Sequence, residues 1–114
     1  MNLDEVMSEL RVEYLESFDE KIQKLEENLM TGNHSDIELE FHKMKGTGQT
    51  YGIDEISTLG MVMETICQKF SGHLAENLPK AITLIRKIVT ARSQDQSYDL
   101  DNDSDFLNLK SIIA

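Results

Sequence analysis

A short polar stretch near the middle of the chain holds residue types that suit phosphoryl transfer. Lys45 and Gly46 follow His42 at positions +3 and +4, so the three residues share one face if the segment is helical. An exposed imidazole is largely neutral near pH 7, and its unprotonated nitrogen can attack phosphorus. The lysine would hold positive charge beside the phosphoryl oxygens. Because phosphoryl transfer depends mainly on positioning and charge, this pattern indicates a histidine that accepts a phosphoryl group.

The helix predicted around this histidine has one face for the core and another for a partner. Its core-facing positions recur in steps of four and three: Ile37, Phe41, Met44, Gly48 and Tyr51. The stripe away from the core is polar or small: Glu38, His42, Lys45, Gly46 and Gln49. We therefore expect a binding partner to meet the face around His42 at Gly46 and Gln49, with Lys43 beside this stripe as a further contact.

Two glycines inside this predicted helix need a physical reason, because each costs about 1 kcal/mol relative to alanine. Gly46 lies one turn after His42, so its missing side chain would leave room for a partner to approach the imidazole. Gly48 lies on the core stripe and would let a neighbouring helix come close. Together the glycines indicate that access to His42 is maintained at the expense of stability.

Apolar residues in steps of three and four predict an amphipathic helix on each side of the first turn signal. The first is one long helix whose stripe runs from Val6 to Leu29, with Gly32 as its C-terminal cap. The second helix, which carries the histidine, opens at a capping-box pair formed by Ser35 and Glu38.

The same periodicity predicts two further helices. The second helix closes at Gly52, and the stripe of the third runs from Ile56 to Phe70. The fourth opens around Asn77, Leu78 and Pro79, since proline is tolerated in a first turn, and runs to about Ser93. Four such helices with short connections favour an all-α fold, an antiparallel up-down four-helix bundle.

The charge distribution predicts where this bundle ends. Residues 53–94 carry four acids and five bases, whereas residues 95–114 carry five acids and one base. We therefore predict a bundle over residues 1–94 and an acidic tail over 95–114. Residues 95–105 are expected to be mobile. The apolar residues of 106–113 are compatible with a short terminal helix that docks on the bundle, and equally with the stub of a longer chain.

Composition excludes several classes of protein. A net charge of −10 argues against a nucleic-acid binder, and the single cysteine, Cys67, excludes an intramolecular disulfide framework. No apolar run is long enough to span a membrane, and the acidic N-terminus lacks the features of a signal peptide. We expect a cytoplasmic, monomeric protein without a metal site or cofactor of its own.

The segment His42-Lys43-Met44-Lys45-Gly46-Thr47, followed by Gly52, resembles the H-x-x-K-G-[ST] signature of histidine phosphotransfer (HPt) domains. The resemblance extends from about residue 8 to residue 93. It implies that His42 accepts a phosphoryl group from a histidine kinase or an aspartyl-phosphorylated receiver domain and passes it to another receiver, which supplies Mg²⁺. It further implies that Lys45 stabilises the phosphoryl group and that Gly46 leaves clearance for the partner.

A second resemblance concerns Glu64, which lies 22 residues after His42 on the next predicted helix. In the N-terminal phosphotransfer domains of chemotaxis-type histidine kinases, a glutamate here hydrogen-bonds the non-phosphorylated ring nitrogen. The segment 14–29 also resembles the first helix of that subgroup. Glu64 is thus expected either to orient the imidazole or to be an ordinary surface carboxylate. Gly48 and Gln49 stand where alanine or serine is common in the family after the lysine-glycine pair, and this departure bears on partner choice.

The sequence therefore predicts a phosphoryl carrier in a two-component phosphorelay. It carries no phosphate-binding loop or glycine-rich lid for ATP, so we expect a carrier and not an enzyme. Two alternatives stay open. The chain would be the phosphotransfer domain of a larger chemotaxis-type histidine kinase, or a helical adaptor that no longer carries phosphate.

Overall fold

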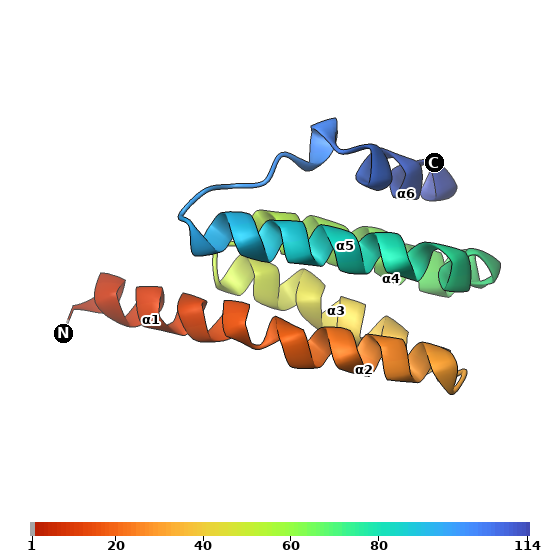
Figure 1. The fold of residues 1–114 in the computed structure, drawn as a ribbon, viewed down its shortest axis with the longest axis horizontal. Coiled ribbons are helices and arrows are strands. Elements are labelled where there is room, and N and C mark those ends of the chain that lie inside the picture. Colours follow the sequence, from red (N-terminus) through yellow and green to blue (C-terminus); the bar gives the residue numbers. More distant parts are fainter. Residues whose placement is uncertain (1) are drawn as a thin grey trace.

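The computed structural model describes residues 2–114, and every regular element in that range is a helix (Figure 1). The six α-helices are α1 (Leu3–Glu16), α2 (Phe18–Met30), α3 (His34–Thr50), α4 (Asp54–Lys69), α5 (Leu74–Ser93) and α6 (Ser104–Ile113). Two short 3₁₀ turns, Ser71–His73 and Leu100–Asn102, precede α5 and α6. The predicted all-α class is confirmed.

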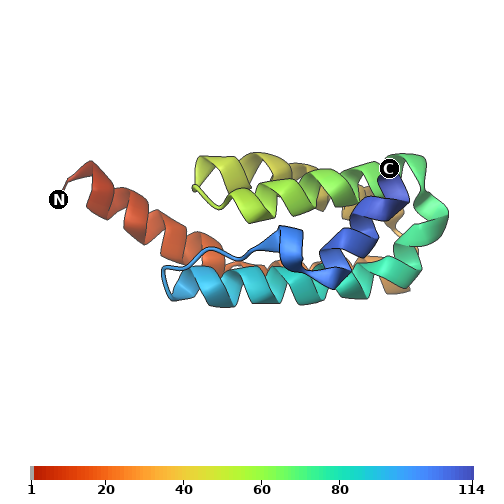
Figure 2. The same cartoon turned by 90° about the horizontal axis from the view of Figure 1, so that it is seen from above.

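The long N-terminal helix was predicted as one element, and this is wrong. The chain bends at Ser17, between α1 and α2. The Ser17 hydroxyl donates to the Tyr14 carbonyl at 2.5 Å and accepts from the Lys21 ammonium group, and such back-bonding bends helices. Periodicity could not reveal the bend, because the apolar stripe continues through it. The outer half of α1 projects beyond the other helices, and Leu3 there is 74% exposed (Figures 1 and 2).

The start of α3 also differs from the prediction. The helix begins at His34, and its N-cap is Asn33, whose side-chain oxygen accepts from the backbone N–H of Asp36 at 3.3 Å. Ser35, predicted as the cap, instead donates its hydroxyl to Asn33. Asparagine caps helices as well as serine does, and Asn33 lies two residues ahead of Ser35, so the helix begins earlier than predicted. The glycines predicted to end helices, at positions 32 and 52, both have φ of +73°, which suits glycine.

Helix α5 begins one turn earlier than predicted. It starts at Leu74, so Pro79 lies inside the helix and not in its first turn. Leu74 and Leu78 are both fully buried against the core. Because burial of an apolar face contributes more to helix stability than intrinsic propensity, the core extends the helix ahead of the proline.

The core draws on every α-helix. Three phenylalanines from different helices, Phe18, Phe41 and Phe106, are almost completely buried in it. The core stripe predicted for α3 is buried at Ile37, Phe41, Met44 and Gly48, whereas Tyr51, predicted as its last member, is the C-cap of the helix and only half-buried. Helix α3 lies between α2 and α4, and α4 packs on its far side against α5 and α6 (Figures 1 and 2). This arrangement makes α3 and α4 neighbours along most of their length.

The C-terminal segment was predicted to be mobile between residues 95 and 105, and the structure instead holds it against α4 and α5. The backbone N–H of Tyr98 donates to the buried Glu55 carboxylate at 3.0 Å, and Leu100 is buried. The Asp103 side chain caps α6 and accepts from Lys87 at 3.1 Å. Composition could not show this, because it treats all acidic residues as solvated. Of the two alternatives for residues 106–113, the docked helix is observed; the boundary at residue 94 stays a prediction.

Phe106→Ala is expected to destabilise the protein by about 3 kcal/mol, because it leaves a cavity where α6 meets α4 and α5. Phe106 is 1% exposed, whereas the neighbouring Leu107 is 48% exposed and serves as the matched control. Urea denaturation followed by circular dichroism measures both variants. Equal, small effects of Phe106→Ala and Leu107→Ala would contradict the docking of α6.

Candidate functional site

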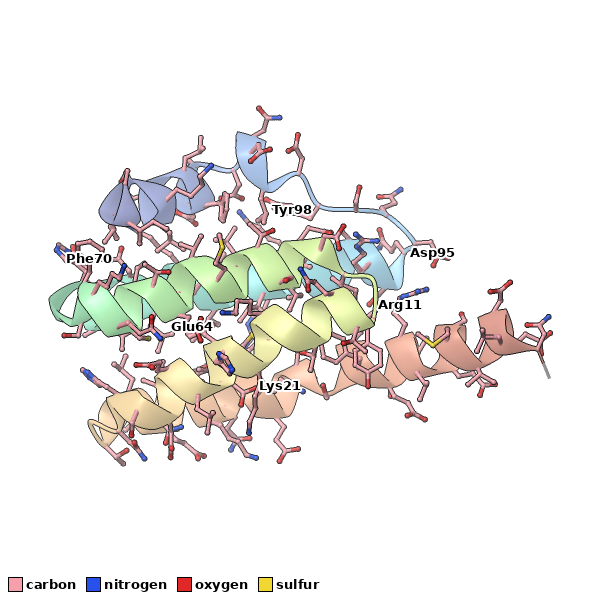
Figure 3. The ribbon with its side chains drawn as sticks, turned by 180° about the vertical axis from the view of Figure 1, so that it is seen from behind. Arg11, Lys21, Glu64, Phe70, Asp95 and Tyr98 are labelled. Carbon is pink, nitrogen blue, oxygen red and sulfur yellow. The ribbon has the colours of Figure 1, made fainter. Side chains whose placement is uncertain are left out.

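The site lies where α3 and α4 meet, and it joins three side chains. The Nδ1 atom of His42 lies 2.5 Å from a carboxylate oxygen of Glu64. The Lys45 ammonium group donates to the other oxygen of Glu64 at 2.7 Å. Figure 3 shows Glu64 in the seam between the α3 and α4 ribbons. The structure therefore brings together His42, Lys45 and Glu64, although 22 residues of chain separate the histidine from the glutamate.

The three groups differ in exposure. The side chain of Glu64 is 10% exposed, that of Lys45 41% and that of His42 61%. The hydrogen bond from Lys45, and then that from His42, lower the pKa of Glu64 below its ordinary value, although burial acts in the opposite direction. Glu64 is thus a charged, mostly buried acceptor beneath an exposed ring. It is not the ordinary surface carboxylate that the sequence left open.

This geometry determines which ring nitrogen of His42 is available. A carboxylate can only accept, so Nδ1 must carry the proton in the bond to Glu64. In the neutral ring the other nitrogen, Nε2, then has the free lone pair. The arrangement therefore presents an oriented nucleophilic nitrogen on an exposed side chain.

The three residues predicted to meet a partner are all exposed on α3, and one of them lines a groove. Gly46 and Gln49 are exposed on α3, and a Cβ added at Gly46 would meet nothing within 4 Å. Lys43 is also exposed, but it lines a groove between α3 and the two N-terminal helices, α1 and α2. Tyr14 and Lys21 line the same groove. Lys43 therefore does not join the hydrogen-bonded group of His42, Lys45 and Glu64.

Sequence reasoning missed two residues of α4 that contact the histidine-bearing helix. The buried Ser57 donates its hydroxyl to the Lys45 carbonyl at 2.6 Å. A Cβ on Gly60 would lie 2.7 Å from the Lys45 backbone nitrogen. The available signal was a glycine inside the third predicted helix, which helix propensity disfavours. Gly48, in contrast, was correctly predicted to allow close approach, since its Cβ would lie 2.5 Å from the Ser57 nitrogen.

A family model described as the Hpt domain matches residues 9–95, which is most of the chain. The chain belongs to the Hpt domain family. Hpt domains are phosphoryl carriers in phosphorelays rather than catalytic enzymes, and they interact with kinases and receiver domains. Searches for similar curated proteins and similar solved structures found no significant match.

Two further properties of this Hpt domain concern metal binding and membranes. Among residues 2–114, no group of three or more His, Cys, Asp and Glu side chains is arranged to hold a metal ion. Within the same residues, no helix combines the length and apolar character needed to cross a bilayer.

The low pKa of Glu64 predicts a pH-dependent contribution to the stability of this Hpt domain. A carboxylate whose folded-state pKa is below the unfolded value of 4.5 stabilises the fold above that pH. The contribution is lost as pH falls through the folded-state pKa. The free energy of unfolding of the wild type should therefore exceed that of Glu64→Gln most at neutral pH, and the gap should narrow below about pH 4.5.

Urea denaturation of both proteins between about pH 7 and pH 3 measures this gap. The difference between the two proteins isolates Glu64 from the other carboxylates that titrate in the same range. Glu26→Gln, a change at an exposed position of α2, is the matched control and should show little difference from the wild type. A gap for Glu64→Gln that is constant across this range would contradict the prediction.

Proposed function

We propose that this chain carries a phosphoryl group on His42 in a two-component phosphorelay. The observation that supports the proposal best is the exposed imidazole whose Nδ1 is 2.5 Å from the buried, charged Glu64. This contact is the one that the resemblance to chemotaxis-type phosphotransfer domains implies. In this proposal α1 and α2 together form the first helix of the family's antiparallel four-helix bundle, and α3, α4 and α5 form the other three. Helix α6 is an addition to that bundle.

The transfer begins with attack of the His42 Nε2 lone pair on the phosphorus of a receiver aspartyl-phosphate. The N–P bond forms as the bond from phosphorus to the aspartate oxygen breaks, and that electron pair leaves with the carboxylate. The ring then carries a positive charge shared by both nitrogens, which the Glu64 carboxylate stabilises through Nδ1–H. The reverse reaction passes the group to the next receiver. A histidine kinase is the alternative donor.

Lys45 supplies positive charge near the phosphoryl oxygens in this proposal. Its ammonium group bonds Glu64 at 2.7 Å and its side chain is 41% exposed, so the lysine can reach an incoming group without leaving the site. The Mg²⁺ that phosphoryl transfer from aspartate needs comes from the receiver domain. The receiver contacts the carrier at Lys43, Gly46 and Gln49, and this interface is transient. The carrier itself is a monomer in the cytoplasm.

Phosphoryl transfer from a panel of radiolabelled receiver domains tests the proposal. Label on this protein that is labile in acid and stable in base identifies a phosphoramidate, and ³¹P NMR assigns it to Nε2 or Nδ1. Attachment at Nε2 is expected, because Nδ1 is held by Glu64. A folded protein that takes no label from receivers or kinases would favour the helical adaptor instead.

The contact between His42 and Glu64 also favours the second candidate, a phosphotransfer domain that works with the catalytic core of a chemotaxis-type kinase. The two candidates differ in their preferred donor. Labelling from ATP in the presence of such a catalytic core, faster than from any phosphorylated receiver, would support the kinase domain. The opposite order would support the relay carrier.

A further inference from the structure

Helices α3 and α4 run in opposite directions. Residues of α4 contact the backbone of α3 along the turns that hold His42 and Lys45. Ser57 bonds the Lys45 carbonyl at 2.6 Å, and one turn later Gly60 lies against the turn from Phe41 to Lys45. One turn further, Glu64 bonds His42. The contacts therefore advance in register along both helices. The backbones approach closely at Gly48 and at Gly60, and Gly60 is the one of the two that lies a single turn from Glu64.

A side chain at position 60 would not fit without moving a helix. A Cβ there would lie 2.7 Å from the Lys45 nitrogen and 2.8 Å from the Phe41 carbonyl oxygen. Both atoms belong to the α3 backbone, so no side-chain rotation relieves the contact. Ordinary contact begins at 3.4 Å, so α4 would have to retreat by roughly 0.7 Å.

The same retreat would act directly on Glu64. Residues 60 and 64 are one turn apart and share a helix face. If the carboxylate moved away with α4 by that amount, its 2.5 Å and 2.7 Å hydrogen bonds would lengthen to about 3.2 Å and 3.4 Å, the outer limit for such bonds. Glu64 is buried at the seam, so its side chain has little freedom to compensate.

We propose that Gly60 is a positioning residue for phosphoryl transfer: its missing side chain lets α4 approach α3 closely enough for Glu64 to hold the proton on Nδ1 of His42. The inference rests on the proposed function for its effect on transfer. Its effect on the ring is independent of that function. Gly60 touches neither the imidazole nor the phosphoryl group, and it acts through Glu64.

The test compares Gly60→Ala with Gly72→Ala, a matched control at which a Cβ would meet nothing within 4 Å. Ring ¹⁵N NMR at a pH of about 9, where an ordinary histidine is neutral, reports which nitrogen of His42 carries the proton. The wild type and Gly72→Ala should show a proton on Nδ1, and Gly60→Ala a mixture of both tautomers. The rate of transfer to Gly60→Ala should fall about ten- to a hundredfold.

A double-mutant cycle with Glu64→Gln separates positioning from a general loss of structure. If Gly60 acts through Glu64, adding Gly60→Ala to Glu64→Gln should slow transfer no further. Additive losses would overturn the proposal, as would a folded Gly60→Ala protein with the wild-type tautomer and rate.

Glu64→Asp keeps the test decisive if Gly60→Ala does not fold, because it withdraws the carboxylate by one methylene without disturbing the helix contact. It should give the same tautomer mixture and loss of rate, and wild-type behaviour would overturn the proposal. A wild type that accepts no label but shows the proton on Nδ1, lost in Gly60→Ala, would contradict the proposed function while supporting the positioning role.

Discussion

Replacing His42 with glutamine is expected to abolish phosphoryl acceptance and leave the fold intact. The glutamine amide nitrogen has no free lone pair, so transfer should fall at least about a thousandfold, to background. The amide can still donate a hydrogen bond to Glu64, and the His42 side chain is 61% exposed. The free energy of unfolding should therefore change by no more than about 0.5 kcal/mol.

Label transfer from phosphorylated receivers and urea denaturation, run on the same preparation, measure the two effects. His73→Gln is the matched control, since His73 is exposed in the short turn before α5. This variant should accept label at the wild-type rate and keep the wild-type stability. Acid-labile label on His42→Gln at the wild-type level would assign the acceptor to another residue.

Leucine at position 46 is expected to raise stability while blocking transfer from receiver domains. Gly46 lies inside α3 and an added Cβ meets nothing within 4 Å, so the fold can accept a larger side chain. Glycine is about 1 kcal/mol less favourable in a helix than alanine, and leucine recovers most of this. The leucine would stand one turn from His42 on the exposed stripe, where it would obstruct a docked receiver. We expect transfer to fall at least about a hundredfold.

A small phosphodonor separates obstruction of docking from damage to the imidazole. Phosphoramidate needs no protein interface, so it should label Gly46→Leu and the wild type at similar rates. Gly46→Ala is the matched variant and should gain stability with a much smaller loss of transfer from receivers. Normal transfer from receivers to Gly46→Leu would refute the role of Gly46 as clearance for a partner.

Sequence reasoning worked best for features that depend on neighbours along the chain. The core stripe of α3 follows from helical periodicity, and it is buried from Ile37 to Gly48. The turns at Gly32 and Gly52 follow from the left-handed backbone that glycine accepts. Details of helix ends were less predictable, since several residues compete for one role. Asn33 displaced Ser35 as a cap, and the hydroxyl of Ser17 bent a helix whose apolar stripe is unbroken.

The remaining differences come from contacts between distant parts of the chain. Glu55 and Asp103 add negative charge to the composition, but both side chains are buried. They accept hydrogen bonds from α5, and Glu55 also accepts one from the C-terminal segment. Burial of acidic groups depends on partners that tertiary packing brings to them. Composition therefore predicted a mobile tail where the molecule has a docked one.

The candidate site likewise combines features set by local spacing with features set by tertiary contacts. Local spacing alone was enough to align His42, Lys45 and Gly46 on one turn of one helix, because helical geometry places residues three and four apart on a common face. The choice of ring nitrogen depends on Glu64, which comes from a second helix. Its carboxylate reaches the imidazole because two backbones touch at Gly60, and the depth of such a contact is set by packing in three dimensions and not by spacing along the chain.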